Sequence, residues 1–405
     1  MDYAETLAYL QARLPMFSRV GKAAYKADLS NTHALMELLG HPERGLKCVH
    51  IAGTNGKGST ANMIASILQC AGYKTGLHTS PHLRDFRERF RINGEMIPQE
   101  AVTAFVEQYR DVFEPVQASF FEWGVALVLD WFRRERTDIA VIECGLGGRL
   151  DSTNVVTPEV SIITNIGWDH ADLLGETLEK IAGEKAGIIK PGVPVVIGEA
   201  EGPIAEVFRQ RAASVGAPIE FVDQGVPLPY RLDLAGGHQV RNARTAVAAI
   251  RALQRKSWAI TEENIAEGLA HVLERTGFRG RWQTLGQTPL TIADIGHNVD
   301  GLHIVNTMLS ETPHNGLHIV LGTVSDKDID RMLGTLPKEA HYYFCKADVP
   351  RGLDATILQA RAQGHGLQGD PFPSVHAALA AAQQAARAGD LVLVTGSAFV
   401  VAEVV

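Results

Sequence analysis

A glycine-rich loop between an apolar strand and a helical stretch constrains this chain more than any other feature. The run Cys48–Ala52 predicts a buried strand, and residues 61–71 predict a helix that ends before Gly72. The loop between them consists of Gly53, Thr54, Asn55, Gly56, Lys57, Gly58, Ser59 and Thr60. Glycines allow a tight turn that directs backbone N–H groups at phosphate oxygens, and the start of the helix adds partial positive charge. The segment therefore predicts a phosphate site.

The side chains of this loop agree with that prediction, although the loop departs from the strict pattern. Lys57 supplies a mobile full charge, and Ser59 or Thr60 can reach a magnesium ion. A strict Walker A sequence would have its first glycine at Ile51 and a hydroxyl residue directly after Lys57. A glycine-rich turn can also be purely structural, but a lysine and hydroxyls in these places favour phosphate binding.

Apolar runs and helical stretches alternate along the rest of the chain. Strands are predicted at residues 48–52, 139–144, 160–164 and 193–197, with helices at 60–71 and 177–182. A second series has strands at 290–293, 318–322, 341–345 and 391–395 and an alanine-rich helix at 374–388. This alternation predicts an α/β protein with mostly parallel sheets.

The length of the chain predicts two domains. At 405 residues it exceeds the size at which single cores usually stop growing. The polar segment 283–289 interrupts the strand and helix pattern. We predict an N-terminal domain of the P-loop type over residues 1–284, and a smaller Rossmann-like α/β domain over residues 288–405.

Composition excludes several classes of protein. A net charge of -8 argues against a general binder of nucleic acid or anionic membranes, because such proteins carry a broad basic surface. The 4 cysteines form no CxxC pair and are too sparse for a disulfide scaffold. The first residues lack a signal-peptide core, and no apolar run approaches bilayer length. We expect a cytoplasmic protein, and a monomer.

Several ordered motifs resemble those of the Mur ligase superfamily, especially its folylpolyglutamate synthase and dihydrofolate synthase branch. After the phosphate loop they lie at residues 79–83, 119–122, 143–154, 165–170, 183–191, 294–298 and 395–397. The resemblance spans nearly the whole chain. It implies a central domain like that of the Mur ligases, ATP as co-substrate bound by the phosphate loop, and two Mg²⁺ sites.

The resemblance also assigns metal ligands. Glu143 ends an apolar strand, so its carboxylate is expected at the carboxyl edge of the sheet, where ligands of such sheets bind. The family pattern gives one Mg²⁺ to Glu143 and Ser80 together with Ser59, and a second to His170. For Lys185 it implies carbamylation by CO₂, which replaces a cation with a carboxylate-like group that can bind Mg²⁺. By composition alone, Lys185 would be a solvent-facing lysine and Glu143 a solvated or capping residue.

The resemblance further implies contacts with substrates. Those on the pterin side are Phe121, Glu122, Leu150, Asp151 and Ser152, joined by Asp28 and Leu29. Asn242 and Arg281 resemble ATP contacts from the N-terminal domain, Asp294 a nucleotide contact from the C-terminal domain, and His297 a glutamate contact. Residues 84–92 are predicted to form a strand with Arg87, Arg89 and Arg91 on one face, either to hold anionic substrate tails or as a solvated face.

These expectations add up to a ligase that joins L-glutamate to dihydropteroate or to reduced folates. The substrate carboxylate would attack the γ-phosphate of ATP, with Lys57, His170 and Lys185 as catalytic residues, and glutamate would then displace phosphate from the acyl phosphate. Two alternatives remain at this point. One is a Mur-type cell-wall ligase with a nucleotide-linked precursor, and the other is an ATP-binding switch without chemistry.

Overall fold

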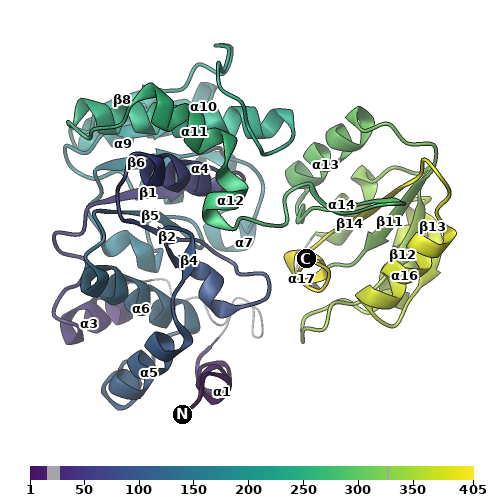
Figure 1. The fold of residues 1–405 in the computed structure, drawn as a ribbon, viewed down its shortest axis with the longest axis horizontal. Helices are drawn as coiled ribbons and strands as arrows, with labels where there is room; N and C mark the ends of the chain where they lie inside the picture. Colours follow the sequence, from purple (N-terminus) through teal and green to yellow (C-terminus); the bar gives the residue numbers. More distant parts are fainter. Residues whose placement is uncertain (16–27, 326–327) are drawn as a thin grey trace. The chain divides into compact units, whose positions relative to one another are not determined.

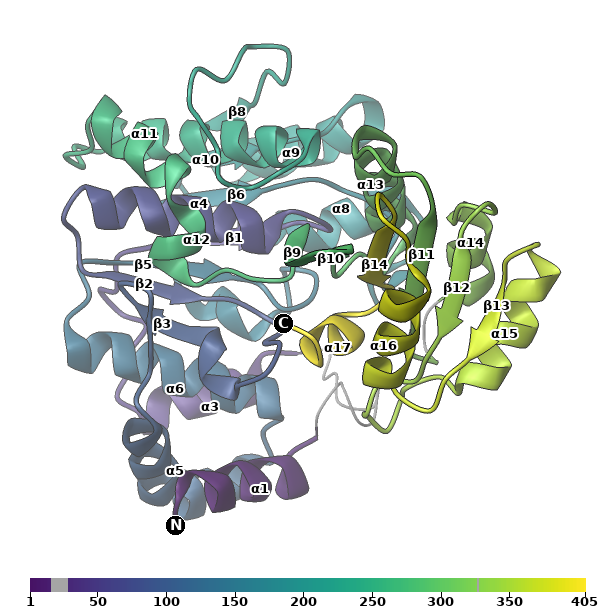
Figure 2. The ribbon, with the colours of Figure 1, turned by 45° about the vertical axis from the view of Figure 1, so that its right-hand side comes forward.

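The computed structural model describes residues 1–15, 28–325 and 328–405, and these separate into two compact units. The N-terminal unit comprises Met1–Asp233 and Gly237–Phe278, and the C-terminal unit comprises Leu234–Gly236 and Arg279–Val405. Each unit contains a β-sheet covered by helices, as the ribbons show (Figures 1 and 2). The predicted α/β class is confirmed.

The N-terminal unit is built on an 8-stranded sheet in the order β4-β3-β2-β5-β1-β6-β7-β8. Its strands are β1 (Cys48–Ala52), β2 (Thr75–His78), β3 (Phe90–Ile92), β4 (Glu95–Met96), β5 (Ile139–Glu143), β6 (Val160–Ile163), β7 (Val195–Ile197) and β8 (Ile219–Phe221). All neighbours pair in parallel except at β3 and β4. The carboxyl ends of β1, β2, β5 and β6 therefore meet at one edge of the sheet. The loops that follow these strands make up the candidate site described below.

Helices cover both faces of this sheet (Figure 1). On one face α4 (Lys57–Cys70) packs with α10 (Gly237–Arg255), α11 (Glu262–Ala270) and α12 (Val272–Thr276). The other face carries α3 (Ser30–Leu38), α5 (Gln99–Phe113) and α6 (Phe120–Glu135), and α1 (Tyr3–Arg13) lies against α5. The remaining helices are α7 (Ala171–Leu174), α8 (Leu178–Ala186) and α9 (Gly202–Ser214), with 3-10 turns η2 (Phe86–Arg89), η3 (Glu114–Val116) and η4 (Ser152–Val155).

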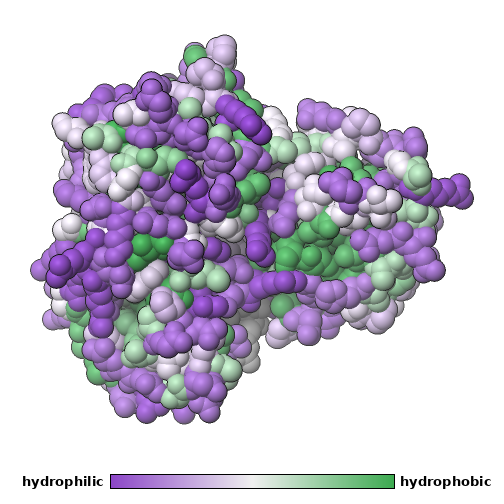
Figure 3. All heavy atoms as spheres, in the orientation of Figure 1, coloured by the Kyte–Doolittle hydropathy of each residue, from purple (hydrophilic) through white to green (hydrophobic). Residues whose placement is uncertain are grey.

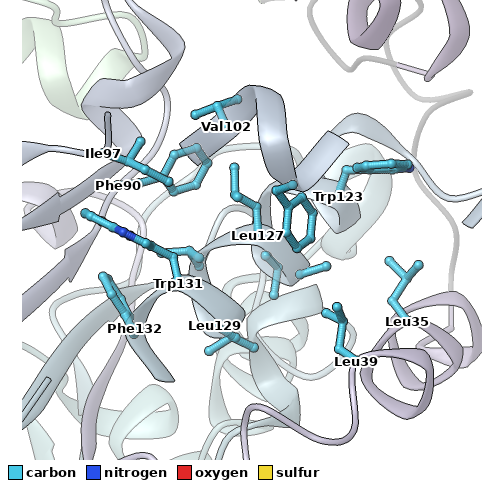
Figure 4. Close-up of a cluster of buried hydrophobic side chains, with 14 of the residues drawn as sticks. Leu35, Leu39, Phe90, Ile97, Val102, Trp123, Leu127, Leu129, Trp131 and Phe132 are labelled. Atoms are coloured by element: carbon cyan, nitrogen blue, oxygen red, sulfur yellow. The ribbon is translucent and has the colours of Figure 1, made fainter. Parts of the chain in front are cut away.

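The hydrophobic core of the N-terminal unit is densest around α6 (Figure 4). Trp123, Leu127 and Phe132 of this helix are buried with Phe90 of β3. Ser119 begins the helix with a capping box, in which its hydroxyl accepts from the N–H of Glu122 and the Glu122 carboxylate accepts from the N–H of Ser119. This cap fixes the start of α6 close to the edge of the sheet where β5 ends.

The C-terminal unit has a 6-stranded sheet in the order β13-β12-β11-β14-β10-β9. Its strands are β9 (Gln283–Gln287), β10 (Leu290–Ala293), β11 (Leu317–Leu321), β12 (His341–Phe344), β13 (Gln368–Pro371) and β14 (Leu391–Thr395). Its helices are α13 (Val299–Glu311), α14 (Ile329–Thr335), α15 (Ala355–Gly364), α16 (Val375–Ala385) and α17 (Ala398–Ala402). Only β9 runs antiparallel to its neighbour, and the unit has a core of its own.

Two segments differ from the sequence-based expectation. Residues 84–92 do not form one strand, because Asp85 caps the turn η2 through the N–H of Arg87 and only Phe90–Ile92 join the sheet. The arginines there therefore do not line one face: Arg87 pairs with Asp85, and Arg91 donates to the carbonyl of Gly94. The segment 283–287, expected to break the pattern, is the edge strand β9, paired with β10.

The face in Figure 3 is mostly hydrophilic, with an apolar area on the C-terminal unit where Figure 1 places α17. Among the described residues, no helix has both the length and the apolar character needed to cross a membrane.

Candidate functional site

The phosphate loop is held in place by the segment that follows β6. The N–H of Thr54 donates to the carbonyl of Asn165 at 3.0 Å, and the N–H of Asn55 donates to Asn165 Oδ1 at 2.9 Å. The Thr164 hydroxyl donates to the carbonyl of Asn55 at 2.6 Å. Gly53 has φ +150°, and a Cβ there would lie 1.9 Å from Thr164 Oγ1. Only glycine allows this approach, so the loop and the segment 164–167 act as one rigid piece.

Two lysines converge on this loop. Lys57 Nζ donates to the carbonyls of Gly53 and Thr54 at 3.1 and 3.0 Å, and Lys185 Nζ donates to the same Gly53 carbonyl at 2.8 Å. Lys185 is 3% exposed. Burial, together with the charge of Lys57, lowers the pKa of Lys185 to about 7. Lys185 is thus a buried amine beside the phosphate loop and not the solvent-facing lysine that composition alone suggests.

Glu143 and Ser80 lie together at the carboxyl edge, as predicted. The Ser80 N–H donates to Glu143 Oε2 at 3.0 Å, and that oxygen would be 3.7 Å from a Cβ at Gly58 of the phosphate loop. Glu143 belongs to β5, where it pairs with Ile51 of β1, so the sheet fixes its position. Ser59 is buried in the first turn of α4, next to Gly58. These oxygen atoms are of the kind that Mg²⁺ binds beside a phosphate.

His170 stands at the start of the short helix α7. Its φ of +50° is unusual for a residue with a side chain, and its Nε2 lies 3.7 Å from Asp169 Oδ1. The loop after β5 packs against both this helix and Lys185. If a Cβ were added at Gly147, it would lie 2.9 Å from Leu174 of α7, and one added at Gly148 would lie 3.0 Å from Lys185 Cα. The structure therefore brings the elements that carry Glu143, His170 and Lys185 to one region.

The residues in this region fit a divalent metal only with mixed ligands. Among the described residues, no group of three or more His, Cys, Asp or Glu side chains could hold a metal ion. Of these four residue types, the predicted metal ligands include only Glu143 and His170. The hydroxyls of Ser59 and Ser80 are also among the predicted ligands. The oxygen donors suit Mg²⁺ once ATP phosphate completes the shell. A second metal would need Lys185 as a carbamate, because an ammonium carries no lone pair.

The predicted pterin-side residues lie beside the same edge. Phe121 packs on the loop after β5, because a Cβ at Gly145 would be 2.6 Å from its ring. Glu122 is buried and accepts from Asn31 of α3 at 3.4 Å. The carboxylate of Asp151 is occupied within its own loop, since Oδ2 accepts from the Leu146 N–H at 2.7 Å and Oδ1 from the Thr153 N–H at 3.0 Å. Leu150 and Ser152 flank Asp151 on this loop, where Leu150 is half-buried and Ser152 buried.

Asp28 and Leu29 precede α3. Asp28 is exposed and accepts from both the N–H and the hydroxyl of Ser30, at 2.8 and 2.6 Å, and Leu29 is the cap residue of α3. α3 also carries Asn31, which donates to Glu122 near the start of α6, so Asp28 and Leu29 lead into a helix that contacts α6. The structure shows a local turn role for Asp28, and its contact with a substrate remains a prediction.

The four remaining predicted residues divide between the two units. Asn242 of α10 lies against the phosphate loop, because a Cβ at Gly56 would be 2.3 Å from its Oδ1. Arg281, which we expected in the N-terminal domain, lies in the C-terminal unit with Asp294 and His297. There Asp294 is buried and accepts from the N–H groups of Trp282 and Gly296, each at 2.9 Å. Burial raises the pKa of Asp294, and the nearby charge of Arg281 opposes that rise.

Sequence reasoning did not assign a role to the residues that hold the phosphate loop. Thr164 ends the apolar run of β6, and Asn165 opens the motif 165–170, so their order in the chain was visible. Their side chains contact a loop more than a hundred residues away, and periodicity carries no information about such a contact.

Comparison with known proteins gives matches along the chain. The Mur ligase middle domain matches residues 51–225, and the Mur ligase glutamate ligase domain matches residues 280–398. A dihydrofolate synthase/folylpolyglutamate synthase of Bacillus subtilis is 35% identical over 85% of this chain and 86% of its own length. A probable bifunctional folylpolyglutamate synthase/dihydropteroate synthase of Haloferax volcanii is 35% identical over 93% of this chain, which spans 48% of that relative.

Solved structures are similar over the full chain. Escherichia coli FolC in complex with DHPP and ADP has a TM-score of 0.88 and 31% identity, and the match covers 100% of this chain and 97% of that one. A bifunctional folylpolyglutamate synthase/dihydrofolate synthase with Mn, AMPPNP and L-glutamate bound has a TM-score of 0.84 and 30% identity, with 100% and 97% covered.

Proposed function

Because this chain belongs to the Mur ligase family of ATP-dependent ligases, in the group of folylpolyglutamate and dihydrofolate synthases, we propose that it joins L-glutamate to both dihydropteroate and reduced folates. The observation that carries the proposal is the convergence of Lys57 and Lys185 on the Gly53 carbonyl of a rigid phosphate loop whose Gly58 adjoins Glu143. The relatives from Bacillus subtilis and Escherichia coli are named dihydrofolate synthase/folylpolyglutamate synthase, and these names support the acceptor class.

The geometry supports phosphoryl transfer to a carboxylate as the first step. The phosphate loop binds ATP through backbone N–H groups and the start of α4, and Lys57 adds positive charge where negative charge develops on the γ-phosphate. Glu143, Ser80 and Ser59 would hold Mg²⁺, which would neutralise charge on the phosphates when bound. The acceptor carboxylate attacks the γ-phosphorus, ADP leaves, and an acyl phosphate forms.

The second step forms the amide bond. The glutamate amine attacks the acyl carbon, and phosphate departs with the bonding electron pair, so one proton of the amine is lost. His297 is the proposed contact for glutamate, and Arg281 and Asp294 are proposed contacts for the nucleotide. Asp28, Leu29, Phe121, Glu122, Leu150, Asp151 and Ser152 are the proposed contacts for the pteroate or folate. We further propose two Mg²⁺ sites, the second at His170 and a carbamylated Lys185, in a cytoplasmic monomer.

Product analysis tests the proposal. Purified protein is incubated with ATP, Mg²⁺ and L-glutamate, together with either dihydropteroate or tetrahydrofolate, and products are identified by mass spectrometry. Both acceptors are expected to gain one glutamyl residue with release of ADP and phosphate. A protein that extends tetrahydrofolate but never converts dihydropteroate would disprove the bifunctional assignment. ATP consumption without any dependence on an amino-acid acceptor would instead favour a nucleotide switch.

A further inference from the structure

A buried polar network lies behind the loop that follows β5. His50, in the middle of β1, is fully buried, and its Nε2 lies 2.8 Å from Thr153 Oγ1 and 3.2 Å from Cys144 Sγ. The Thr153 hydroxyl lies 2.5 Å from Asp151 Oδ1. A continuous chain of polar contacts thus connects a core strand to the loop of residues 145–151, and the proposed reaction steps make no use of it.

The direction of each hydrogen bond follows from the chemistry of the groups. The Thr153 hydroxyl donates its single proton to Asp151 Oδ1, and the hydroxyl oxygen is left to accept from His50. Burial lowers the pKa of His50 to about 3, so the ring is neutral at physiological pH and carries one N–H. Within the described chain His50 Nδ1 has no hydrogen-bond partner, and a proton there would be a buried unsatisfied donor. The proton therefore belongs on Nε2.

Asp151 in turn determines the shape of its loop. Its carboxylate accepts from the backbone N–H groups of Leu146 and Thr153, and so closes the loop from both ends. Strand pairing ends at Glu143, so residues 145–151 lack that support. The position of Glu143 depends on the sheet, and the phosphate loop depends on Thr164 and Asn165. Loss of the network is therefore expected to disturb the loop, whereas Glu143 and the phosphate loop keep supports of their own.

We propose that His50 and Thr153 are positioning residues for the acceptor substrate, which hold Asp151 and its neighbours in the conformation that receives the pteroate or folate. This inference rests on the proposed function, in which Leu150, Asp151 and Ser152 contact that substrate. Neither His50 nor Thr153 touches the substrate, since both are buried behind the loop.

Steady-state kinetics of two threonine variants test the proposal. Thr153→Val keeps the shape of the side chain but removes the hydroxyl, whereas Thr153→Ser keeps the hydroxyl. For Thr153→Val we expect the KM for dihydropteroate to rise about tenfold or more, with the KM for ATP unchanged, because one buried hydrogen bond to Asp151 is lost. Thr153→Ser should stay close to the unaltered protein. A matched control is Thr6→Val, which removes another buried hydroxyl, the one that donates to the carbonyl of Asp2.

The outcomes separate the inference from the function on which it rests. Equal KM values for dihydropteroate in Thr153→Val and the unaltered protein, or an equal rise for ATP, would overturn the inference. A protein that makes no product from either acceptor would instead overturn the proposed function. A nitrogen-15 NMR measurement of the His50 tautomer in the unaltered protein tests the network independently. It requires neither an activity assay nor a variant that folds. An Nε2–H ring supports it, and an Nδ1–H ring refutes it.

Discussion

Two lysine side chains donate to one backbone carbonyl in this protein, and their closeness affects the pKa of Lys185. Lys57 and Lys185 each donate to the Gly53 carbonyl, from helices far apart in the sequence. Like charges so close together, in a buried place, favour the loss of one proton, and Lys185 is the more deeply buried of the two. We therefore assign to Lys185, and not to Lys57, the amine that is available for modification.

The first prediction concerns Lys57. Lys57→Ala should lower turnover by about two to three orders of magnitude, because it removes charge stabilisation from the transferring phosphoryl group. The fold should be retained, since the Nζ atom contacts loop carbonyls and not the core. A matched control is Lys256→Ala, which removes a partly exposed lysine paired with Glu159 and should leave turnover unchanged. A folded Lys57→Ala protein with normal turnover would exclude the assigned role.

Lys185 gives the second prediction. If the amine is carbamylated, Lys185→Ala should be nearly inactive, and Lys185→Glu should keep a little activity because it restores a carboxylate on a shorter stem. The exposed Lys180 on the same helix offers a control, and Lys180→Ala should behave like the unaltered protein. Activity is measured with and without added bicarbonate. A high-resolution map of the magnesium-bound enzyme that shows an unmodified Lys185 ammonium would contradict the prediction.

Among the elements, the turn between β1 and α4 has a conformation that allows little change. Gly53→Ala should abolish ATP binding and lower the melting temperature, because φ +150° and a contact of 1.9 Å with Thr164 Oγ1 leave no space for a Cβ. Gly183→Ala is the matched control: it lies inside α8, where a Cβ would meet nothing within 4 Å. That variant should gain up to about 1 kcal/mol of stability, since alanine favours helix. Calorimetric titration with ATP and thermal unfolding would measure both effects.

Two strands of the N-terminal sheet carry buried histidines, which predicts sensitivity to acid. Burial holds the pKa of His50 near 3 and that of His78 near 4, against an ordinary value of 6.5. Between about pH 6.5 and pH 4 the unfolded chain therefore binds more protons than the native one, so the free energy of unfolding falls as pH falls. Each histidine contributes a slope of about 1.4 kcal/mol per pH unit in that window.

Urea unfolding at pH 6.5, 5.5 and 4.5 would test this slope. His78→Gln removes one of the two buried imidazoles, and the fall in stability with acid should be shallower by about one proton. His303→Gln, on the exposed face of α13, provides the comparison for replacing an imidazole by an amide. Identical slopes for His78→Gln and the unaltered protein would mean that His78 is not kept neutral in the native state.

For the molecule as a whole, the two units have separate cores. Ile319, Tyr342, Phe344 and Leu393 are among the buried residues of the C-terminal cluster, and all come from the strands of its own sheet. A fragment of residues 279–405 should therefore fold alone and unfold cooperatively in urea, because it keeps the whole sheet. Circular dichroism would follow the transition. A broad transition without a native baseline would show that this unit depends on the rest of the chain.

The sequence correctly predicts the class of fold and most strand positions, and it predicts a phosphate site at residues 53–60. It could do so because alternation of apolar runs, glycine spacing and the order of motifs are local properties of a chain. Residues 84–92 and 283–287 were interpreted wrongly, because capping by Asp85 and pairing of β9 with β10 override what their pattern indicates.

Which residues meet depends on the tertiary structure. The contact of Lys185 with the Gly53 carbonyl, the support of Asn55 by Asn165 and the chain from His50 to Asp151 each join segments distant in sequence. Such contacts depend on the register of parallel strands, which brings separate loops to one edge of a sheet. Burial depends on the same packing, and it converts Lys185 from an ordinary surface cation into an amine whose pKa is about 7.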